Sequence, residues 1–178
     1  MMKLNIPELS LVLLVGPSGC GKSTFARRHF RPSEIVSSDH YRGVVCDDEA
    51  NQAASRDAFD LVFQVIERRL RWRRLTVVDA TNVQAEARKS LLDLARQYHY
   101  LTSAIVFDIG ESQCQLHNQL RSGRTVPPHV IVAQYQHLLQ SLATLPREGV
   151  KRIYHFRTLA EIDQATIVRI PLHIDRRE

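Results

Sequence analysis

The chain has few cysteines and no long apolar segment, and each shortage excludes a class of protein. Its 178 residues include three cysteines, Cys20, Cys46 and Cys114, which are far apart in the sequence. An odd, scattered set argues against a disulfide framework and indicates a reducing compartment, so we expect a cytoplasmic protein. No apolar run reaches the roughly 18 residues that a membrane-spanning helix needs, and the N-terminus lacks the features of a signal peptide. We therefore expect no membrane partner.

Lysine is also scarce: four lysines stand beside twenty arginines, and the formal net charge is +5. The planar guanidinium of arginine suits phosphate recognition, so this balance favours a polyanionic partner over a neutral small molecule. A solvated basic surface explains the same composition equally well. Charge alone leaves both interpretations open.

Short apolar runs alternate with amphipathic segments along the chain. The runs expected to form strands are 11–15, 35–36, 76–79, 104–108 and 152–156. Between the second and third runs, one helical face carries Phe59, Val62, Phe63, Ile66 and Leu70. The alternation predicts an α/β fold in which a central parallel β-sheet is flanked by helices on both faces. No repeat or linker-like break interrupts it, so we expect one domain over residues 1–170.

A phosphate-binding motif follows the first apolar run. The segment matches G-x-x-x-x-G-K-[ST] and consists of Gly16, Pro17, Ser18, Gly19, Cys20, Gly21, Lys22 and Ser23, followed by Thr24. The glycines let the backbone N–H groups point inward at a helix N-terminus and form an anion nest. Lys22 supplies a charge for the β- and γ-phosphates, and the Ser23 hydroxyl is a ligand for Mg²⁺. We predict a nucleotide-phosphate site in a P-loop NTPase fold.

The remaining strand-end carboxylates distinguish classes of P-loop protein. The sequence lacks the Asn-Lys-x-Asp guanine reader of GTPases and the Asp-Glu pair of motor or AAA-type ATPases, since Ala80 follows Asp79 and Ile109 follows Asp108. Asp39, after the second run, is placed to face the γ-phosphate and to accept a proton from a substrate hydroxyl. The alternative is that Asp39 caps a helix or turn.

The third apolar run ends in Asp79, which we expect to hold a Mg²⁺-bound water. Thr81 and Asn82 follow it, and for Asn82 we favour an N-cap of the next helix over a role in reading substrate. Asp108 is a weaker candidate that we interpret as a strand-end carboxylate.

Two basic segments have competing interpretations. Residues 111–128 predict a helix stopped by the two prolines at its end, with Arg121 and Arg124 on one face. Such a helix is expected to form a lid over the phosphates and to supply arginines to the transition state, with a solvated face as the alternative. The arginine-rich run 68–74 contains Trp72, which suggests nucleic-acid binding, but cations also stabilise a helix C-terminus, and we favour that structural interpretation.

Taken in order, these residues resemble the kinase domain of bacterial polynucleotide kinase-phosphatase, an RNA end-repair enzyme. The matching segments are 6–11, 16–25, Ser37-Ser38-Asp39, Arg42-Gly43, 47–49 and Val77-Val78-Asp79-Ala80-Thr81-Asn82-Val83. The resemblance implies transfer of the ATP γ-phosphate, with Mg²⁺, to a 5′-OH end of RNA or DNA.

The resemblance also implies roles for single residues. Asp39 is then the general base, Arg42 grips the phosphate 3′ of the acceptor nucleoside, and Arg121 and Arg124 are lid arginines on the ATP phosphates. At His117 the chain departs from the usual arginine, so no role is carried over to it. Residues after Phe156 are expected to flank the adenine.

Residues 171–178 resemble the run that leads into the next domain of the full-length family protein, so we expect phosphatase and ligase domains in the same polypeptide. Two other functions stay open at this point. One is a P-loop kinase of a small-molecule alcohol or nucleoside, and the other is a non-catalytic module switched by nucleotide. Acceptor length separates the two kinases, and the effect of Asp39→Ala separates both from the switch module.

Overall fold

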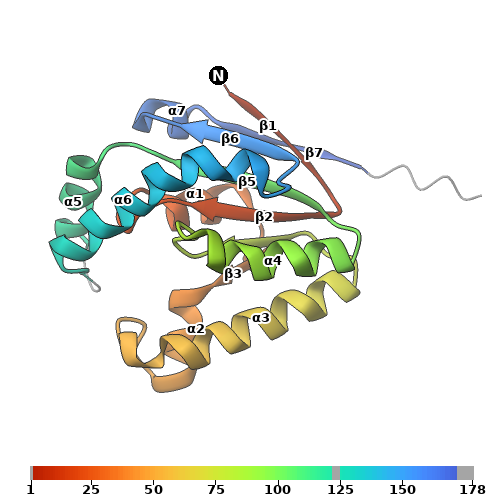
Figure 1. The fold of residues 1–178 in the computed structure, drawn as a ribbon, viewed down its shortest axis with the longest axis horizontal. Coiled ribbons are helices and arrows are strands. Elements are labelled where there is room, and N and C mark those ends of the chain that lie inside the picture. The colour runs from red at the N-terminus through yellow and green to blue at the C-terminus, as the bar shows by residue number, and fades with distance from the viewer. Residues whose placement is uncertain (1, 122–124, 172–178) are drawn as a thin grey trace, which may run out of the picture.

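The computed structural model describes residues 2–121 and 125–171, and its centre is a five-stranded parallel sheet (Figure 1). The strand order is β3-β4-β2-β5-β6. The strands are β2 (Ser10–Val15), β3 (Ile35–Ser37), β4 (Thr76–Asp79), β5 (Leu101–Phe107) and β6 (Arg152–Phe156). Every residue of β2 is buried, because the continuous apolar run is covered on both faces. The α/β fold with a parallel sheet is confirmed.

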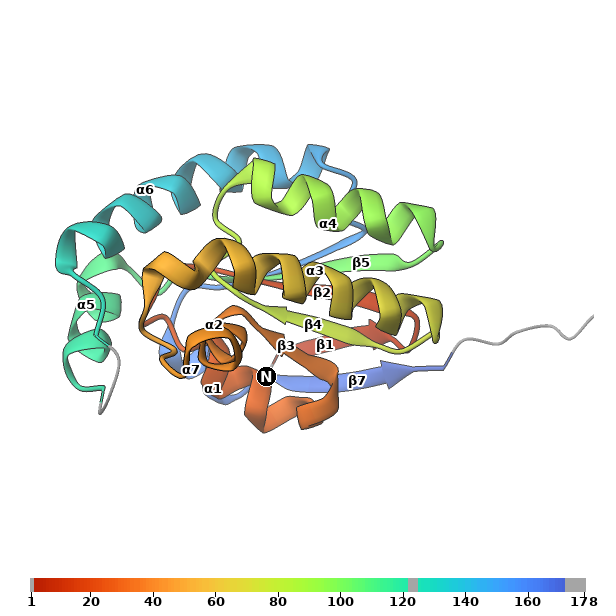
Figure 2. The same cartoon turned by 90° about the horizontal axis from the view of Figure 1, so that it is seen from below.

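Helices cover the sheet on both faces. Successive side chains of β2 point to opposite faces and therefore belong to two separate cores. Leu11 and Leu13 pack with α3 (Ser55–Arg71), α4 (Ala85–Gln97) and α6 (Pro128–Thr144), which lie along one face (Figure 2). Val12 and Leu14 belong to the other core, with Phe25 of α1 (Lys22–His29). The remaining helices are α2 (Ser38–Cys46), α5 (Glu111–Gln119) and α7 (Leu159–Asp163), with 3₁₀ turns at 32–34, 52–54 and 145–147. No helix within the described ranges is long and apolar enough to span a membrane.

A second, two-stranded sheet was not expected from the sequence. The strands β1 (Lys3–Pro7) and β7 (Thr166–Ile170) pair in parallel and lie on the opposite side of the molecule from α3 and α4 (Figures 1 and 2). Leu4 and Ile6 of β1 are fully buried. From β7, Arg169 pairs with Glu34 at 2.7 Å and stacks over the Phe30 ring at 5.0 Å. Both segments mix polar and apolar residues, so neither contains the continuous apolar run that indicated the other strands.

An aromatic cluster anchors α1 to the central sheet. The Phe25 ring lies 5.4 Å from Phe107 at the end of β5 and 5.5 Å from Phe156 at the end of β6. Such ring pairs contribute about 0.5–1.5 kcal/mol each beyond the area that they bury. The cluster therefore fixes the start of α1, and with it the loop that precedes the helix.

The predicted helix over 111–128 is wrong in length, because α5 ends at Gln119. The reason is a turn held by Asn118, whose Nδ2 donates to the Val126 carbonyl at 2.8 Å and whose Oδ1 accepts from Val126 N at 2.9 Å. These bonds satisfy backbone groups that a continuing helix would have used. Arg124 and residues 172–178, on which the lid and linker predictions fall, lie outside the described residues.

The helical face predicted between the second and third apolar runs belongs to α3 and is only partly buried. Val62, Ile66 and Leu70 of α3 are in the core, whereas the Phe59 and Phe63 side chains are 46% and 37% exposed. The two phenylalanines come from the first half of the helix, near the carboxyl edge of the sheet. They line a hollow there instead of the core.

Candidate active site

The predicted phosphate loop connects the end of β2 to the start of α1. Gly19 and Gly21 have φ angles of +85° and +96°, which glycine adopts without steric cost. Gly21 is the N-cap of α1, and the first N–H groups of the helix point out of this terminus toward any bound anion. Gly16 N donates to the Thr81 carbonyl at 2.9 Å. The loop entry is thereby tied to the turn after β4.

The Lys22 side chain lies inside the loop and is 8% exposed. Its Nζ donates to the Gly16 carbonyl at 2.7 Å and to the Pro17 carbonyl at 2.6 Å, and it contacts Cys20 Sγ at 3.4 Å. The loop carbonyls stabilise the ammonium where the chain curls around it. The structure thus brings a positive charge into the loop that the motif predicts to bind phosphate.

Helices α5 and α6 hold the loop from outside. Gln134 Oε1 of α6 accepts a hydrogen bond from Ser18 N at 2.8 Å. His117 Nδ1 of α5 lies 3.1 Å from the Gly19 carbonyl, and Gln113 Nε2 lies 2.9 Å from His117 Nε2. A neutral imidazole that accepts from Gln113 donates through Nδ1 to the loop. Neither residue was predicted to have a role. No motif spacing links Gln134 to the loop, and His117 stands where the resembled family usually has an arginine.

Asp79 ends β4 beside the loop and is 6% exposed. Burial raises the pKa of Asp79, a hydrogen bond from Ser23 and the charge of Lys22 oppose that rise, and the neighbouring Asp39 carboxylate adds to it. A hydroxyl and two carboxylates are therefore close to one another. Mg²⁺ prefers such hard oxygen ligands and commonly takes one or two carboxylates plus substrate phosphates.

The chemistry of this donor set fits the predicted Mg²⁺. Across residues 2–121 and 125–171, the structure contains no group of three or more His, Cys, Asp or Glu side chains arranged to hold a metal ion.

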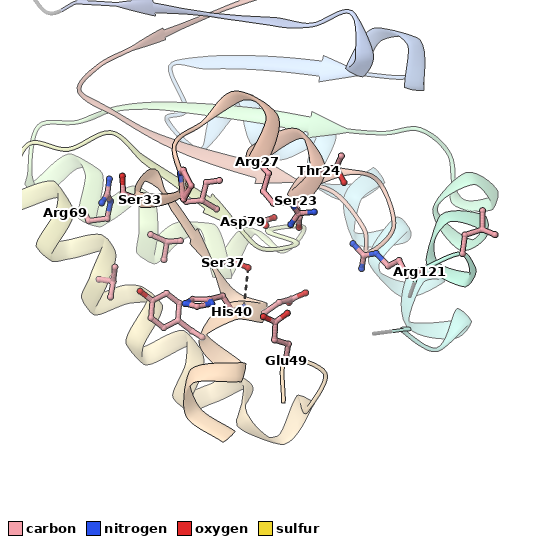
Figure 3. A pocket seen from close by; sticks show the side chains of 17 residues that line it. Ser23, Thr24, Arg27, Ser33, Ser37, His40, Glu49, Arg69, Asp79 and Arg121 are labelled. Carbon is pink, nitrogen blue, oxygen red and sulfur yellow. Dashed lines mark hydrogen bonds between the residues drawn. The ribbon is translucent and has the colours of Figure 1, made fainter. Parts of the chain in front are cut away.

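Asp39 lies in the first turn of α2, two residues beyond the end of β3. The N-cap of α2 is Ser37, whose hydroxyl accepts from His40 N at 3.4 Å (Figure 3), so the interpretation of Asp39 as the cap is wrong. Arg42, one turn further on, forms an ion pair with Asp39 through Nη2. Its Nε donates to the Glu49 carbonyl at 2.8 Å. The Arg42 side chain is 4% exposed and that of Asp39 is 36% exposed, so the arginine is held in place while the carboxylate faces open space.

Two hollows meet at Asp39. The smaller, of about 260 Å³, is called the inner pocket and is lined by residues of the phosphate loop together with Asp39, Arg42, Thr81 and Arg121. The larger, of about 1060 Å³, is called the edge groove. Figure 3 shows the edge groove with Arg69 at one end, Arg121 at the other, and Ser23 and Asp79 between them. The predicted phosphate, metal and base residues thus converge at one place.

The N-cap prediction for Asn82 is wrong. Helix α4 begins at Ala85, and its N-cap is Gln84. Asn82 has a φ of +47°, and its Nδ2 donates to the Leu14 carbonyl at 2.8 Å and, more weakly, to the Val78 carbonyl at 3.4 Å. The amide therefore braces the carboxyl ends of β2 and β4, which carry the phosphate loop and Asp79.

Arg121 lines both the inner pocket and the edge groove. The prediction that Arg121 lies on a helix is wrong, because α5 ends at Gln119, and Arg124 lies outside the described residues.

Asp108 and the arginine-rich run have structural partners. Tyr135 Oη donates to Asp108 Oδ1 at 3.0 Å, and His155 Nε2 lies 3.2 Å from Asp108 Oδ2. Burial and the bond to Asp108 raise the pKa of Tyr135 to about 12. In the run 68–74, Arg69 Nη2 donates to the Leu75 carbonyl at 2.8 Å and joins the end of α3 to β4. Both features brace the fold.

Comparison with known proteins gives a family and a fold. A family model described as an AAA domain matches residues 11–145, although Ala80 follows Asp79 and the expected Asp-Glu pair is absent. The missing glutamate therefore does not exclude the chain from this family, as the sequence had suggested. Among curated proteins, the phosphate import ATP-binding protein PstB 3 of Streptococcus pneumoniae is 40% identical over 55 residues, which are 31% of this chain and 22% of that protein. The chain therefore spans about a fifth of the length of this relative.

Solved structures share a P-loop kinase-like fold with this chain. A chain of the Pnkp1/Rnl/Hen1 RNA repair complex matches with a TM-score of 0.67 and 24% identity, covering 77% of this chain and 46% of that one. A gluconokinase from Sinorhizobium meliloti matches with a TM-score of 0.57 and 16% identity, covering 89% of this chain and 87% of that one. The fold therefore occurs in chains named for RNA repair and for small-molecule kinase activity.

Proposed function

The chain belongs to the AAA domain family, and on that premise we propose that it is an ATP-dependent kinase of 5′-OH polynucleotide ends. The observation that carries the proposal is the buried Arg42 beside the more open Asp39, in the same pocket as the phosphate loop. A kinase of any alcohol needs the carboxylate and the loop. A guanidinium fixed next to the base suits an acceptor that carries its own phosphate.

In the proposed reaction, Asp39 accepts the proton of the acceptor 5′-hydroxyl. The hydroxyl oxygen forms a bond to the γ-phosphorus of ATP, the bond from that phosphorus to the β–γ bridging oxygen breaks, and ADP leaves. Arg42 keeps its Nε bond to the Glu49 carbonyl and presents the rest of its guanidinium to the phosphate 3′ of the acceptor nucleoside. The carboxylate and the guanidinium thereby fix the hydroxyl relative to the acceptor phosphate.

The phosphate loop holds ATP in this proposal. The loop from Gly16 to Thr24 wraps around the phosphates, with the backbone N–H groups from Gly19 to Thr24 as donors. Lys22 exchanges its loop carbonyls for the β- and γ-phosphate oxygens. Arg121, on the wall of the inner pocket, stabilises charge on the transferred group, and we assign Arg124 the same role. Ser23 and a water on Asp79 would hold Mg²⁺, which would supply positive charge beside the phosphates.

The likeness to a chain of an RNA repair complex supports a nucleic-acid end as the acceptor. We propose that residues 1–170 form the kinase domain, that 171–178 begin a linker, and that phosphatase and ligase domains belong to the same cytoplasmic polypeptide. The chain spans 46% of the repair-complex chain, which leaves room in that relative for further domains.

A kinase of a small-molecule alcohol is the second candidate, supported by the likeness to a gluconokinase over 87% of that chain. The buried Arg42 favours the polynucleotide, because a neutral alcohol has no anion to place against it. The two candidates predict opposite orders of preference between a free nucleoside and an oligonucleotide.

The test is transfer of label from γ-labelled ATP with Mg²⁺ to a 5′-OH RNA oligonucleotide, with a free nucleoside as the parallel acceptor. We expect labelled RNA, a loss of about 10²–10⁴ in rate for Asp39→Ala with ATP binding retained, and a larger effect of Arg42→Ala on RNA than on ATP binding. Asp163→Asn, an exposed carboxylate change with a side chain 67% exposed, is the control and should match wild type. Label on the nucleoside but not on RNA would replace the proposal with the small-molecule kinase.

A further inference from the structure

A third hollow adjoins the inner pocket and is lined mainly by residues of α3, α4 and α6. These three helices lie along one face of the sheet (Figure 2). We call it the apolar pocket. Its volume is about 610 Å³, within the usual range for small-molecule sites of about 300–1,000 Å³. Its walls are Phe59, Val62, Phe63, Val78, Val83, Ala87 and Leu91, with Ser90, Gln84, Gln134 and His137 among the polar residues. None of the proposed catalytic residues lines it.

The apolar pocket continues directly from the inner pocket. Phe59, Thr81 and Gln134 line both hollows. Along α3, Ser55 lines the inner pocket, Phe59 lines both, and Phe63 lines the apolar pocket. These three residues are four apart, so they form one row on the helix and advance by about 6 Å each. A ligand that is bound at Arg42 and extends along this row contacts Phe59 and then Phe63.

The charges of the lining select what part of a polynucleotide enters. Asp60 is the one carboxylate in the lining, and no Arg or Lys contributes to it among the residues that the structure describes. Such a wall repels a phosphate and accepts an uncharged planar group. Aromatic side chains bind nucleobases by stacking, without strong preference for sequence.

We propose that the apolar pocket binds the second nucleobase of a single-stranded acceptor, counted from the 5′-hydroxyl end. The inference rests on the proposed function, since it takes the first nucleoside to lie at Asp39 and its 3′-phosphate to lie at Arg42. The second base then stacks on Phe59 and Phe63, and the hydroxyl and amide groups of Ser90 and Gln84 face its edges. A 5′-OH strand must therefore expose two unpaired nucleotides to be a good acceptor.

The experiment compares three 5′-OH acceptors with γ-labelled ATP: a nucleoside 3′-phosphate, an RNA dinucleotide, and the same dinucleotide with an abasic second residue. All three offer Arg42 its phosphate, and one offers a second base. We expect kcat/KM for the intact dinucleotide to exceed that for the abasic one by about tenfold, the scale of one base–aromatic stack. We expect Phe63→Ala to bring that ratio close to one.

Two further variants test whether the second nucleobase binds in the apolar pocket. Ala87→Phe fills the apolar pocket from the α4 wall and should lower the ratio as Phe63→Ala does. Trp72→Ala removes an aromatic that is 76% exposed at the other end of α3 and should leave the ratio unchanged. Equal kcat/KM for intact and abasic dinucleotides, or an unchanged ratio in both pocket variants, would overturn the subsite alone. No label on any acceptor, longer RNA included, would overturn the proposed function and the subsite with it.

Discussion

Single contacts shape the phosphate loop, and the tightest is at Gly19. A Cβ atom on this residue would lie 2.1 Å from the Cys114 carbonyl oxygen of α5, far inside van der Waals contact. Because the atom it would meet belongs to the helix backbone, no side-chain movement relieves the clash. The same glycine carbonyl lies 3.1 Å from His117 Nδ1. The loop and α5 are thus fitted to one another at a single residue.

We predict that Gly19→Ala weakens ATP binding at least tenfold, since the loop must move away from α5 to make room for the methyl group. The matched control is Gly149→Ala, which has a similar φ of +89° and whose nearest neighbour is the Arg96 side chain at 3.5 Å. Both variants bear the left-handed backbone cost of about 1–2 kcal/mol in stability. Calorimetric titration with ATP and thermal unfolding separate the two effects. Wild-type ATP affinity in Gly19→Ala would show that the fit to α5 does not matter for binding.

The residues of the site differ in how far the sequence could predict them. Lys22 and Ser23 follow from local spacing, because the loop is one continuous segment before a helix. Gln134 and the bracing role of Asn82 depend on which distant strands and helices are neighbours, so local spacing does not reveal them. Asn82 was predicted to be a cap because an asparagine side chain suits both helix capping and strand bracing. The N-cap of α4 is Gln84, two residues later, so Asn82 is free to brace the strands.

Among the elements, α4 and α6 hold the turn after β4 through one buried arginine. The Arg88 side chain is fully buried and donates to the Asn82 carbonyl at 2.7 Å, to Ser141 Oγ at 3.0 Å and to both carboxylate oxygens of Glu148 at 2.8 and 2.5 Å. Ser141 Oγ in turn donates to the Val83 carbonyl. The turn that carries Thr81 into the inner pocket is therefore clamped between two helices.

We predict that Arg88→Met lowers the free energy of unfolding by about 3–5 kcal/mol, because it leaves the Glu148 carboxylate and the Asn82 carbonyl without their partner. Lys89→Met, on the same helix, breaks an ion pair whose lysine side chain is 75% exposed and should cost about 1 kcal/mol or less. Urea unfolding of both variants measures the difference. A cost for Arg88→Met no larger than that for Lys89→Met would contradict the clamp.

The ion pair between Arg88 and Glu148 also makes the free energy of unfolding depend on pH. Burial by itself raises the pKa of Glu148, but the hydrogen bonds from Arg88 and Thr144 outweigh it, so the pKa is lowered from its ordinary 4.5. A carboxyl with a lowered pKa in the folded state contributes stability above its unfolded pKa and loses it as pH falls through the folded one. Wild type should lose this contribution below about pH 4.5, and Arg88→Met should show a shallower loss there.

Elements were predicted well where one face or the whole of a segment is apolar. The five strands of the central sheet follow from their runs, whereas the end of α5 depends on the bonds of Asn118 to a residue eight positions away. Helical periodicity also cannot tell a core face from a hollow. Periodicity therefore groups Phe59 and Phe63 on one helical face with the core residues of α3, although the two phenylalanines line a pocket.

At the scale of the whole molecule, the β1–β7 sheet joins residues near the two ends of the described chain. Its pairs run from Lys3 with Thr166 to Pro7 with Ile170, over 160 residues apart in sequence. Leu4 and Ile6 reach from this sheet into the core that contains Phe25, Phe107 and Phe156. Pairings at this separation leave no local pattern in the sequence, so they could not be predicted from it. They nonetheless cover the aromatic cluster beneath the phosphate loop.

We predict that Ile6→Ala lowers the free energy of unfolding by about 2–5 kcal/mol, because it leaves a cavity in that core. Val168→Ala, in the partner strand β7 with its residue 41% exposed, should cost about 0.5 kcal/mol or less. Both variants should bind ATP like wild type below their unfolding transitions, since the inner pocket is lined by neither strand. Urea unfolding with and without ATP tests both statements. An unfolding midpoint unchanged in Ile6→Ala would mean that β1 folds apart from the central sheet, whereas reduced ATP affinity would mean that the second sheet shapes the phosphate loop itself.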